Sequence, residues 1–358
     1  MSLTNHNPNI EININLSAPP GAEPNFQTPI LFVPLATNSL DSDVVRSYGS
    51  ADDVADDLTA SYISALTAAQ LTAMFQQLRP SPEIVKAASV DLVGSVTYGT
   101  ALSVARAIDP AFYFVSIQPR TQTEIDLMSD AVEAEKKSLF MFQDDDGDWL
   151  TSGVPAALAG IVANERTSGV YHDEDTEPLA EAAIAMGMGF SPDEKSAPFT
   201  MTITGVDSYT AGLTAGQRMF ALANNINVMG EFGSVDTWLD KGTNLQGREI
   251  RHLVTRDWLD YRIRQRVSDM IITRSNRGDI LPVTREGQVL VMSILSTLFD
   301  EGVAAGHFKL DQFVPIFPTI TATDLSNRRV RVSANATLLV GGRLVTYTIN
   351  LDTADVIA

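Results

Sequence analysis

The stretch AFYFVSIQPRTQTEIDLMSDAVEAEKKSLFMF, residues 111–142, carries two strand patterns separated by a helix pattern. Ala111–Ile117 and Leu139–Phe142 are rich in aromatic and aliphatic residues, which is typical of buried strands. Between them, Thr121 can cap a helix that runs to about Lys136. The apolar residues of this helix recur on one face: Ile125, Met128 and Val132. This order predicts two parallel strands joined by a crossover helix.

The same alternation continues after residue 142. We predict a helix over Pro155–Glu165, a short strand at Val170–His172 and a helix from Pro178 to about Met186. Repeated units of this kind form a parallel or mostly parallel sheet with helices on its faces. Residues 30–198 are therefore expected to form an α/β domain.

Residues 199–342 have a different pattern and are expected to form a second domain, of the α+β class. The elements expected from residue 199 onward are a strand over Phe199–Val206, a helix over Leu213–Asn224, a helix over Arg256–Thr273 capped by Thr255, a helix over Arg285–Ala305, and strands over Val330–Val340 and Leu344–Leu351. Glycines at 230, 233, 242 and 247 are suited to turns. Gly341 and Gly342 can join the last two strands in a hairpin.

Both ends of the chain carry strand patterns. The apolar residues of the first strand alternate with polar ones, as in a half-buried strand: Ile10, Ile12, Ile14 and Leu16. Residues 17–29 are proline-rich and cannot fold this strand into a local hairpin, so residues 1–29 are interpreted as an arm and a connector, and the strand must pair elsewhere. Residues 343–358 are interpreted as a C-terminal arm whose strand positions are Leu344, Thr346, Tyr347, Ile349 and Leu351.

The composition is that of a globular protein. The chain of 358 residues is 44% hydrophobic with a mean hydropathy of +0.03, enough for two domains that each bury a core. It contains no cysteine, which excludes disulfides, thiolate catalysis and cysteine-based zinc sites. No apolar run reaches the length of a membrane span, and residues 1–15 lack the features of a signal peptide. We expect a soluble protein that folds in a reducing cytoplasm.

The net charge of −19 is unevenly distributed. Residues 1–247 carry 11 basic and 32 acidic side chains, whereas residues 248–358 carry 14 basic and 12 acidic side chains. An acidic field repels nucleic acid and anionic membranes. We therefore expect no nucleic-acid partner and no membrane insertion, and we expect the charge-balanced third to pack against protein partners.

Two acidic segments contain the residue types of metal ligands. Asp144–Asp148 resembles a calcium loop, but with Gly147 at the sixth position the first and twelfth positions are Phe142 and Gly153, where carboxylates are needed. His172 is followed by three acidic residues, Asp173, Glu174 and Asp175, but neighbours in sequence rarely converge on one ion. Both segments are interpreted as solvated loops, and no metal is expected.

Other signals of catalysis are weak. Gly187-Met188-Gly189 follows a helix and lacks the third glycine of a phosphate-binding loop. The remaining histidines, His6, His252 and His307, have no serine elbow or paired carboxylate at a telling spacing. The sequence therefore predicts no cofactor and no enzymatic activity.

Three arginines on the predicted helix over residues 256–273 allow two interpretations. Arg262 and Arg266 are one turn apart, and Asp260 lies four residues before Arg264. This spacing suits an intrahelical ion pair on an ordinary charged face. A contact with a partner protein is the other interpretation, and the sequence leaves both open.

Several segments from about Thr200 onward resemble the contractile tail sheath family, in particular a short branch of it. These segments are Ile203–Val206, Leu213–Thr214, Ala223–Val228, Arg256–Leu259, Ile280–Thr284 and Phe313–Ile316. Their order and spacing are similar to those of the family's shared C-terminal domain. The N-terminal strand, its proline-rich connector and Thr28-Pro29-Ile30 also resemble sheath N-termini, whereas residues 40–197 match only loosely.

The resemblance implies a two-domain subunit with a shared domain facing the tail tube and a variable domain facing outward. It also implies extended N- and C-terminal β-arms that add strands to neighbouring subunits. The implied partners are further copies in a helical polymer of stacked hexameric rings, the tail tube protein, and the baseplate and tail terminator proteins. The implied place is the tail of a virion assembled in the host bacterial cytoplasm, where contraction drives the tube through the host envelope. Arg262, Arg264 and Arg266 would then face the tube or another subunit.

Two other functions remain open. The chain could be another polymerising component of a tail or baseplate. It could also be a small-molecule-binding α/β enzyme, although the missing glycine-rich loop, nucleophile and metal set argue against this.

Overall fold

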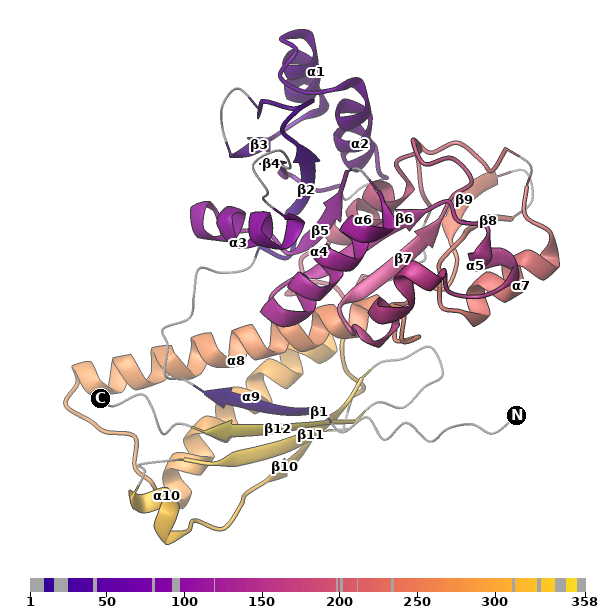
Figure 1. The fold of residues 1–358 in the computed structure, drawn as a ribbon. Helices are drawn as coiled ribbons and strands as arrows, with labels where there is room; N and C mark the ends of the chain where they lie inside the picture. The colour runs from indigo at the N-terminus through magenta and orange to yellow at the C-terminus, as the bar shows by residue number, and fades with distance from the viewer. Residues whose placement is uncertain are drawn as a thin grey trace. The chain divides into compact units, whose positions relative to one another are not determined.

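The computed structural model describes residues 10–15, 25–40, 44–78, 81–91, 97–118, 120–197, 199, 202–210, 212–232, 235–310, 313–326, 330–338 and 346–352. The chain divides into two compact units, shown in Figure 1. We call residues 24–191 and 197–253 the α/β unit, and residues 1–23, 192–196 and 254–358 the helix–sheet unit. This division places residues 199–253 with the α/β unit, whereas the sequence pattern started the second domain at residue 199.

A six-stranded sheet in the order β3-β4-β2-β5-β6-β7 forms the centre of the α/β unit. Its strands are β2 (Pro29–Pro34), β3 (Val45–Tyr48), β4 (Val85–Val90), β5 (Phe114–Ile117), β6 (Leu139–Asp144) and β7 (Thr167–Tyr171). Neighbouring strands are parallel except for β3, which is antiparallel to β4 at one edge. The prediction of a mostly parallel sheet is confirmed.

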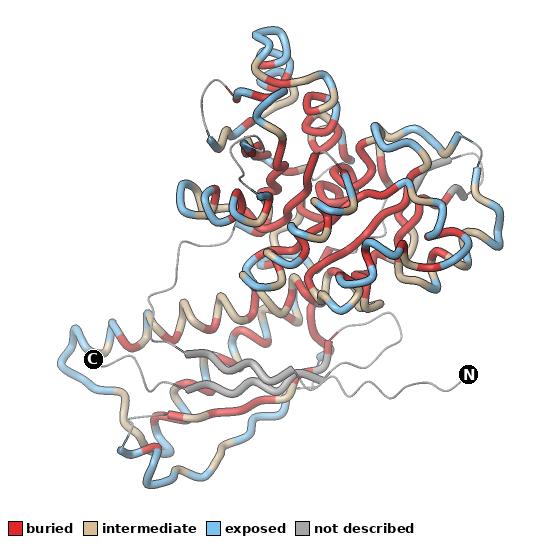
Figure 2. The backbone as a smooth tube through the Cα atoms, in the orientation of Figure 1, coloured by how far each residue is buried: buried red, intermediate tan, exposed pale blue. Residues whose placement is uncertain are grey.

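Helices cover both faces of this sheet. The helices on one face are α1 (Ala51–Thr59), α2 (Ala65–Phe75) and α6 (Leu179–Met188), and those on the other are α3 (Tyr98–Ile108), α4 (Gln122–Glu135) and the 3-10 helix η2 (Ala156–Ala163). Strand β2 shows how the sheet is buried on both sides. Ile30 and Phe32 pack in the core formed with α3 and α4, while Leu31 and Val33 pack in the core formed with α1 and α2. Figure 2 shows the central strands as buried along their length, as expected of a sheet covered on both faces.

The predicted helix between the two strands of the opening stretch is confirmed as α4. The Thr121 side chain accepts a hydrogen bond from the Glu124 backbone N–H at its start, and Ile125, Met128 and Val132 are buried. The remaining elements of this unit are α5 (Asp148–Thr151), α7 (Ala215–Ala223), and the antiparallel pair β8 (Met229–Phe232) and β9 (Val235–Leu239).

The helix predicted over residues 155–165 is present as the 3-10 helix η2, in which Leu158 and Ile161 are buried. One prediction for the α/β unit was wrong. The predicted strand at 199–206 is a loop over residues 203–206. There the Gln77 side chain takes the place of a neighbouring strand: its amide donates to the Thr204 carbonyl (2.8 Å) and accepts from the Thr204 N–H (3.1 Å).

The helix–sheet unit combines long helices with a four-stranded sheet in the order β1-β12-β11-β10. Its elements are β1 (Ile10–Asn15), residues 254–276 of α8 (Ile250–Asn276), α9 (Arg285–Ala304), β10 (Val314–Ile316), α10 (Ala322–Ser326), β11 (Val332–Thr337) and β12 (Thr346–Asp352). Strand β11 is antiparallel to both β10 and β12, which confirms the predicted C-terminal hairpin pairing, and α9 packs on β11.

Helix α8 starts earlier than predicted. It begins at Ile250, so Thr255 lies inside it and is not a cap. The Thr255 hydroxyl is hydrogen-bonded to Nδ1 of His307 (2.6 Å), and both side chains are buried. One face of the helix is apolar and buried, formed by Leu259, Ile263, Val267 and Ile271. Within the part of the chain that the structure describes, no helix is both long and apolar enough to cross a membrane.

Candidate functional site

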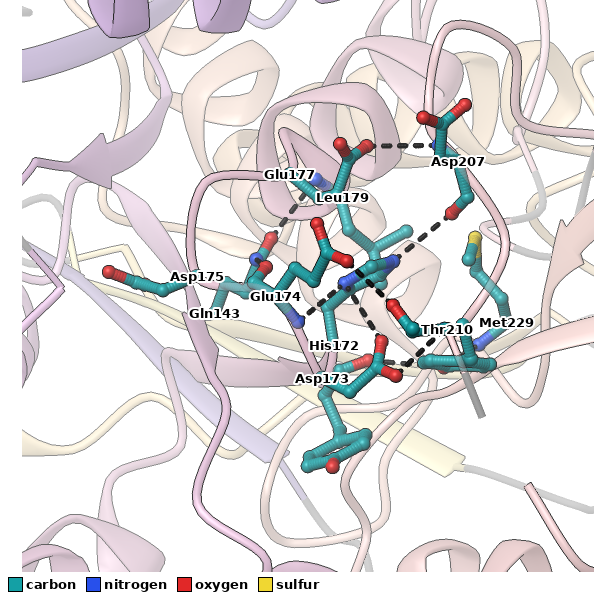
Figure 3. Close-up of polar contacts among 12 residues, drawn as sticks. Gln143, His172, Asp173, Glu174, Asp175, Glu177, Leu179, Asp207, Thr210 and Met229 are labelled. Atoms are coloured by element: carbon teal, nitrogen blue, oxygen red, sulfur yellow. Dashed lines mark hydrogen bonds and ion pairs between the residues drawn. The ribbon is translucent and has the colours of Figure 1, made fainter. Parts of the chain in front are cut away.

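The carboxyl ends of β6 and β7 are where an α/β fold would place a catalytic or ligand site. The segment after β7 carries His172, whose Nδ1 accepts a hydrogen bond from the Glu174 N–H (3.0 Å). Nδ1 is therefore an acceptor, and the other ring nitrogen, Nε2, donates to the Asp207 carbonyl (3.1 Å). Figure 3 shows these groups pointing toward one another across the two segments. The histidine thus joins two loops.

The neighbouring carboxylates make similar links, also drawn in Figure 3. Asp173 accepts from the Thr210 N–H (2.8 Å), and Glu174 accepts from the Thr210 hydroxyl (2.6 Å). Glu177 accepts from the Asp207 N–H (2.9 Å). Among the described residues, no group of three or more histidine, aspartate or glutamate side chains is placed to hold a metal ion. These residues hold the 207–210 loop against the end of β7.

The acidic loop after β6 also has a structural role. Asp144 is buried and accepts from the indole N–H of Trp149 (2.8 Å). Burial raises the pKa of Asp144 above its ordinary range. Asp146 accepts from the Asp148 N–H (2.9 Å) and from the Gln122 side chain (2.9 Å). The carboxylates thus fix the start of α5 and connect it to α4.

A buried ion pair that the sequence did not predict lies after β5. Nη2 of Arg120 and Oε2 of Glu181 are 2.6 Å apart, and their side chains are 2% and 0% exposed. Burial raises the pKa of Glu181, and the adjacent Arg120 guanidinium opposes this rise. Arg120 also donates through Nη1 to the carbonyls of Glu177 (2.7 Å) and Asp175. The pair fixes the loop before α6 to the end of β5.

Each of the three arginines singled out on α8 has an acidic partner within the helix–sheet unit. Arg264 pairs with Asp260 (2.9 Å), which confirms the predicted intrahelical ion pair. Arg266 pairs with Glu301 of α9 (2.6 Å), and Arg262 pairs with Asp193. A contact between these arginines and a partner protein stays a prediction.

Arg262 belongs to a group of side chains that holds residues 192–196 on the helix–sheet unit. Asp193 accepts from the Trp258 indole N–H (2.8 Å) and from Nε of Arg262 (2.9 Å). His307 stacks on Trp258 with ring centroids 4.8 Å apart and donates through Nε2 to the Pro192 carbonyl (2.6 Å). We call Asp193, Trp258, Arg262 and His307 the clamp. Local periodicity gave no sign of it because Asp193 and His307 are far in sequence from Trp258 and Arg262 of α8.

The clamp should make the stability of the fold sensitive to acid. Burial alone would raise the pKa of Asp193, but the hydrogen bonds and charge of Arg262 and the Trp258 N–H outweigh it and hold this pKa below its ordinary value. A carboxyl with a lowered folded-state pKa stabilises the fold above its unfolded pKa, and this contribution is lost as the pH falls through the folded pKa. We therefore expect thermal unfolding scans from pH 7 to pH 3 to show a smaller loss of Tm for Asp193→Asn than for the unmodified chain. An equal loss in both would contradict this role of Asp193.

The predicted arm residues meet in the four-stranded sheet. Strand β1 is parallel to β12 of the same chain, and β12 is antiparallel to β11. The register places three rows of residues side by side: Ile10, Tyr347 and Ala336; Ile12, Ile349 and Ala334; Ile14, Leu351 and Val332. The three β11 members of these rows are buried. Thr346 is paired with Thr337, while Leu16 and Leu344 lie outside the described residues.

The matched rows explain why the register is specific. A slip by one residue would bring Ile10, Ile12 and Ile14 opposite polar residues of β12 such as Thr348 and Asn350. The structure therefore brings both terminal strands into one sheet of a single chain, whereas the resemblance had implied pairing with neighbouring subunits.

Comparisons with known proteins give matches at the level of structure. No protein-family model matches the sequence, and no curated protein does. The chain is similar to the helical sheath of the anti-feeding prophage in its contracted state, with a TM-score of 0.63 and 13% identity over 93% of this chain and 95% of that one. It is also similar to a chain of the six-fold symmetrised baseplate of the anti-feeding prophage (TM-score 0.61, 11% identity, 95% and 94% covered). A third similar structure is a sheath tail protein from Listeria innocua (TM-score 0.57, 11% identity, 94% and 97% covered).

The chain has the fold of contractile sheath proteins. This sheath fold accounts for both units, because each match covers more than nine-tenths of the chain.

Proposed function

We propose that this chain is the structural subunit of a contractile tail sheath, which polymerises around a tail tube and contracts to drive it through a host envelope. The observation that carries the proposal is the likeness of almost the whole chain to a contracted helical sheath. A partial likeness could reflect one shared domain on an unrelated protein. A likeness over 93% of the chain extends beyond either of the two units alone.

The contacts of the α/β unit favour a structural role over an enzymatic one. The titratable side chains at the strand ends are used to connect loops: His172 and Asp173 hold the 207–210 loop, and Arg120 and Glu181 hold the start of α6. A catalytic site needs groups that are free to meet a substrate. We therefore propose that the chain is not an enzyme and needs no cofactor.

We propose that subunits are linked by exchange of terminal strands. The six residue pairs between β1 and β12 would be identical if β1 came from a second copy, so exchange preserves every backbone hydrogen bond of the sheet. Residues 16–24, between β1 and the described part of the α/β unit, can span roughly 30 Å when extended. This reach is comparable with the diameter of a small domain, which makes a neighbour accessible.

The strength of such links suits a lattice that must rearrange without coming apart. At about 0.5–1.5 kcal/mol net per hydrogen bond, one exchanged arm contributes a few kcal/mol. Each subunit would donate one arm and accept one, and the links of many subunits act together, so the lattice is held much more tightly than one arm would hold it. In this proposal the arms stay paired while the domains move, and a metastable extended lattice relaxes to a contracted one. The proposed partners are further copies in stacked hexameric rings, the tube protein, and baseplate and terminator proteins of a virion tail assembled in a bacterial cytoplasm.

A second candidate is a subunit of a baseplate assembly. The observation that favours it is the similarity to a chain of a six-fold symmetrised baseplate structure, which is nearly as high as that to the sheath. Electron microscopy of the purified chain separates the two. We expect wide, striated tubes for a sheath subunit. Rings or small closed assemblies at every concentration would favour the baseplate component, and a monomer at every concentration would contradict both.

A further inference from the structure

The four-stranded sheet has two edges, and they differ in their capacity to accept another strand. The order β1-β12-β11-β10 places β1 at one edge and β10 at the other. An edge strand presents backbone N–H and C=O groups that can pair with another chain. Whether both edges can do so decides how copies of this chain can be joined through the sheet.

Strand β10 contains a proline at its centre. Its three residues pair with β11 as Val314 with Asn335, Pro315 with Ala334, and Ile316 with Ser333. Because proline has no N–H, Pro315 and Ala334 cannot exchange two hydrogen bonds, so their pair is of the non-hydrogen-bonded type. In an antiparallel ladder the flanking residues then direct their own N–H and C=O groups to β11. The outer edge of β10 is therefore left with the Pro315 carbonyl and no N–H.

The side chains of β10 would otherwise favour pairing. All three residues are exposed, and Val314 and Ile316 remain 55% and 39% accessible. Both are β-branched residues of the kind that stabilise paired strands. An exposed edge with two such residues is a site of unwanted association unless something blocks it. Pro315 supplies this block without removing the strand, in the edge position that proline tolerates.

We infer that Pro315 closes the β10 edge to strand addition, so that the sheet accepts a strand from a second copy only on its β1 side. The partner excluded is another β10 strand, which would pair antiparallel with this one. Such a contact is isologous: it joins two copies about a two-fold axis and closes on itself. A helical polymer needs contacts that continue from copy to copy. Only the consequence for a helical polymer rests on the proposed function. The block at Pro315 is a property of the sheet in a single chain.

The absence of cysteine allows a direct test. Val314→Cys places one thiol on the exposed edge. In the antiparallel β10–β10 register whose two-fold axis passes between the two copies of residue 314, these thiols lie opposite each other in a non-hydrogen-bonded pair and are close enough to form a disulfide. Val314→Cys alone is expected to stay unlinked on mild oxidation, as judged on a non-reducing denaturing gel. Val314→Cys with Pro315→Thr restores an N–H at the edge and is expected to give mostly disulfide-linked dimers. Pro318→Thr with Val314→Cys is the matched control, because it removes a nearby proline outside the strand, and it is expected to stay unlinked.

Two results would overturn the inference. One is efficient cross-linking of the Val314→Cys chain with Pro315 in place, which would mean that the edge is open. The other is a folded Val314→Cys/Pro315→Thr chain, with unchanged circular dichroism, that links no better than the Pro318→Thr control. Pro315→Ala repeats the second comparison with the smallest side chain if threonine unfolds the sheet. The gel measures disulfide-linked dimers formed through β10, and it does so whether or not the protein forms tubes. Its result is therefore independent of the electron microscopy that tests the proposed function.

Discussion

Deleting residues 1–16 is expected to abolish ordered tubes while leaving the α/β unit folded. The deletion removes β1 and with it six register pairs to β12. Strand β12 would then be an open edge in every copy, and no copy would have an N-terminal strand to place on it. The expected result is amorphous or unassembled protein by electron microscopy, with circular dichroism that keeps the helical signal of the α/β unit.

A shorter deletion is the control for this experiment. Removing residues 1–9 shortens the chain but leaves β1, which begins at Ile10, so tubes are expected to form as in the unmodified chain. The outcome that would contradict the arm linkage is clear: ordered, contractile tubes from the chain that lacks residues 1–16.

Replacing Arg120 by methionine is expected to cause a large loss of stability in the α/β unit. The substitution leaves the Glu181 carboxylate fully buried without its cation, and it removes the donors to the Glu177 and Asp175 carbonyls. Breaking one half of a buried ion pair costs about 3–5 kcal/mol. Urea unfolding at pH 7 should show a reduction of this size in the free energy of unfolding.

Two comparisons separate the buried charge from lost packing. The double variant Arg120→Met/Glu181→Met removes both charges and is expected to recover most of the stability, because apolar replacements of buried pairs are often tolerated. Arg218→Met breaks the half-exposed pair with Asp240 and is expected to cost less than about 1 kcal/mol. A loss in Arg120→Met no larger than that of Arg218→Met would contradict the argument.

The pH dependence of the Arg120→Met variant gives a further check. Burial raises the pKa of Glu181, and a group with a raised folded-state pKa stabilises the fold below its unfolded pKa and loses this contribution as the pH rises. Without Arg120 the charge that most strongly opposes this rise is gone, so the destabilisation should shrink as the pH is lowered from 7 toward 5. A loss of stability that grows on acidification would show that the Glu181 charge is not its cause.

The elements that local patterns specify were predicted well. Helix α4 follows from the Thr121 cap and the stripe of Ile125, Met128 and Val132, and β1 follows from its alternating isoleucines. Local sequence patterns do not show which distant residue of the chain each segment contacts. The loop at residues 203–206 was predicted as a strand, but its backbone hydrogen bonds go to the Gln77 side chain and not to another strand. Thr255 was predicted as a helix cap, but its hydroxyl is hydrogen-bonded to His307, which lies 52 positions away in sequence.

The candidate assembly site shows the same limit. The alternation of Ile10, Ile12 and Ile14 indicates a strand, and the residues around Ile349 indicate another. Neither pattern says that the two strands pair with each other, or that they do so in parallel. The clamp and the Arg120–Glu181 pair could not have been found either, because each joins residues more than sixty positions apart.

The parallel pairing of β1 with β12 has a consequence for how the protein is made. Among the described elements, β1 is the first to leave the ribosome and β12 is the last. The sheet of one chain therefore cannot be completed until translation has passed Asp352, and until then a nascent β1 is available to any finished copy nearby. In a cell that makes many copies at once, the order of synthesis itself would favour mixed sheets over self-completed ones.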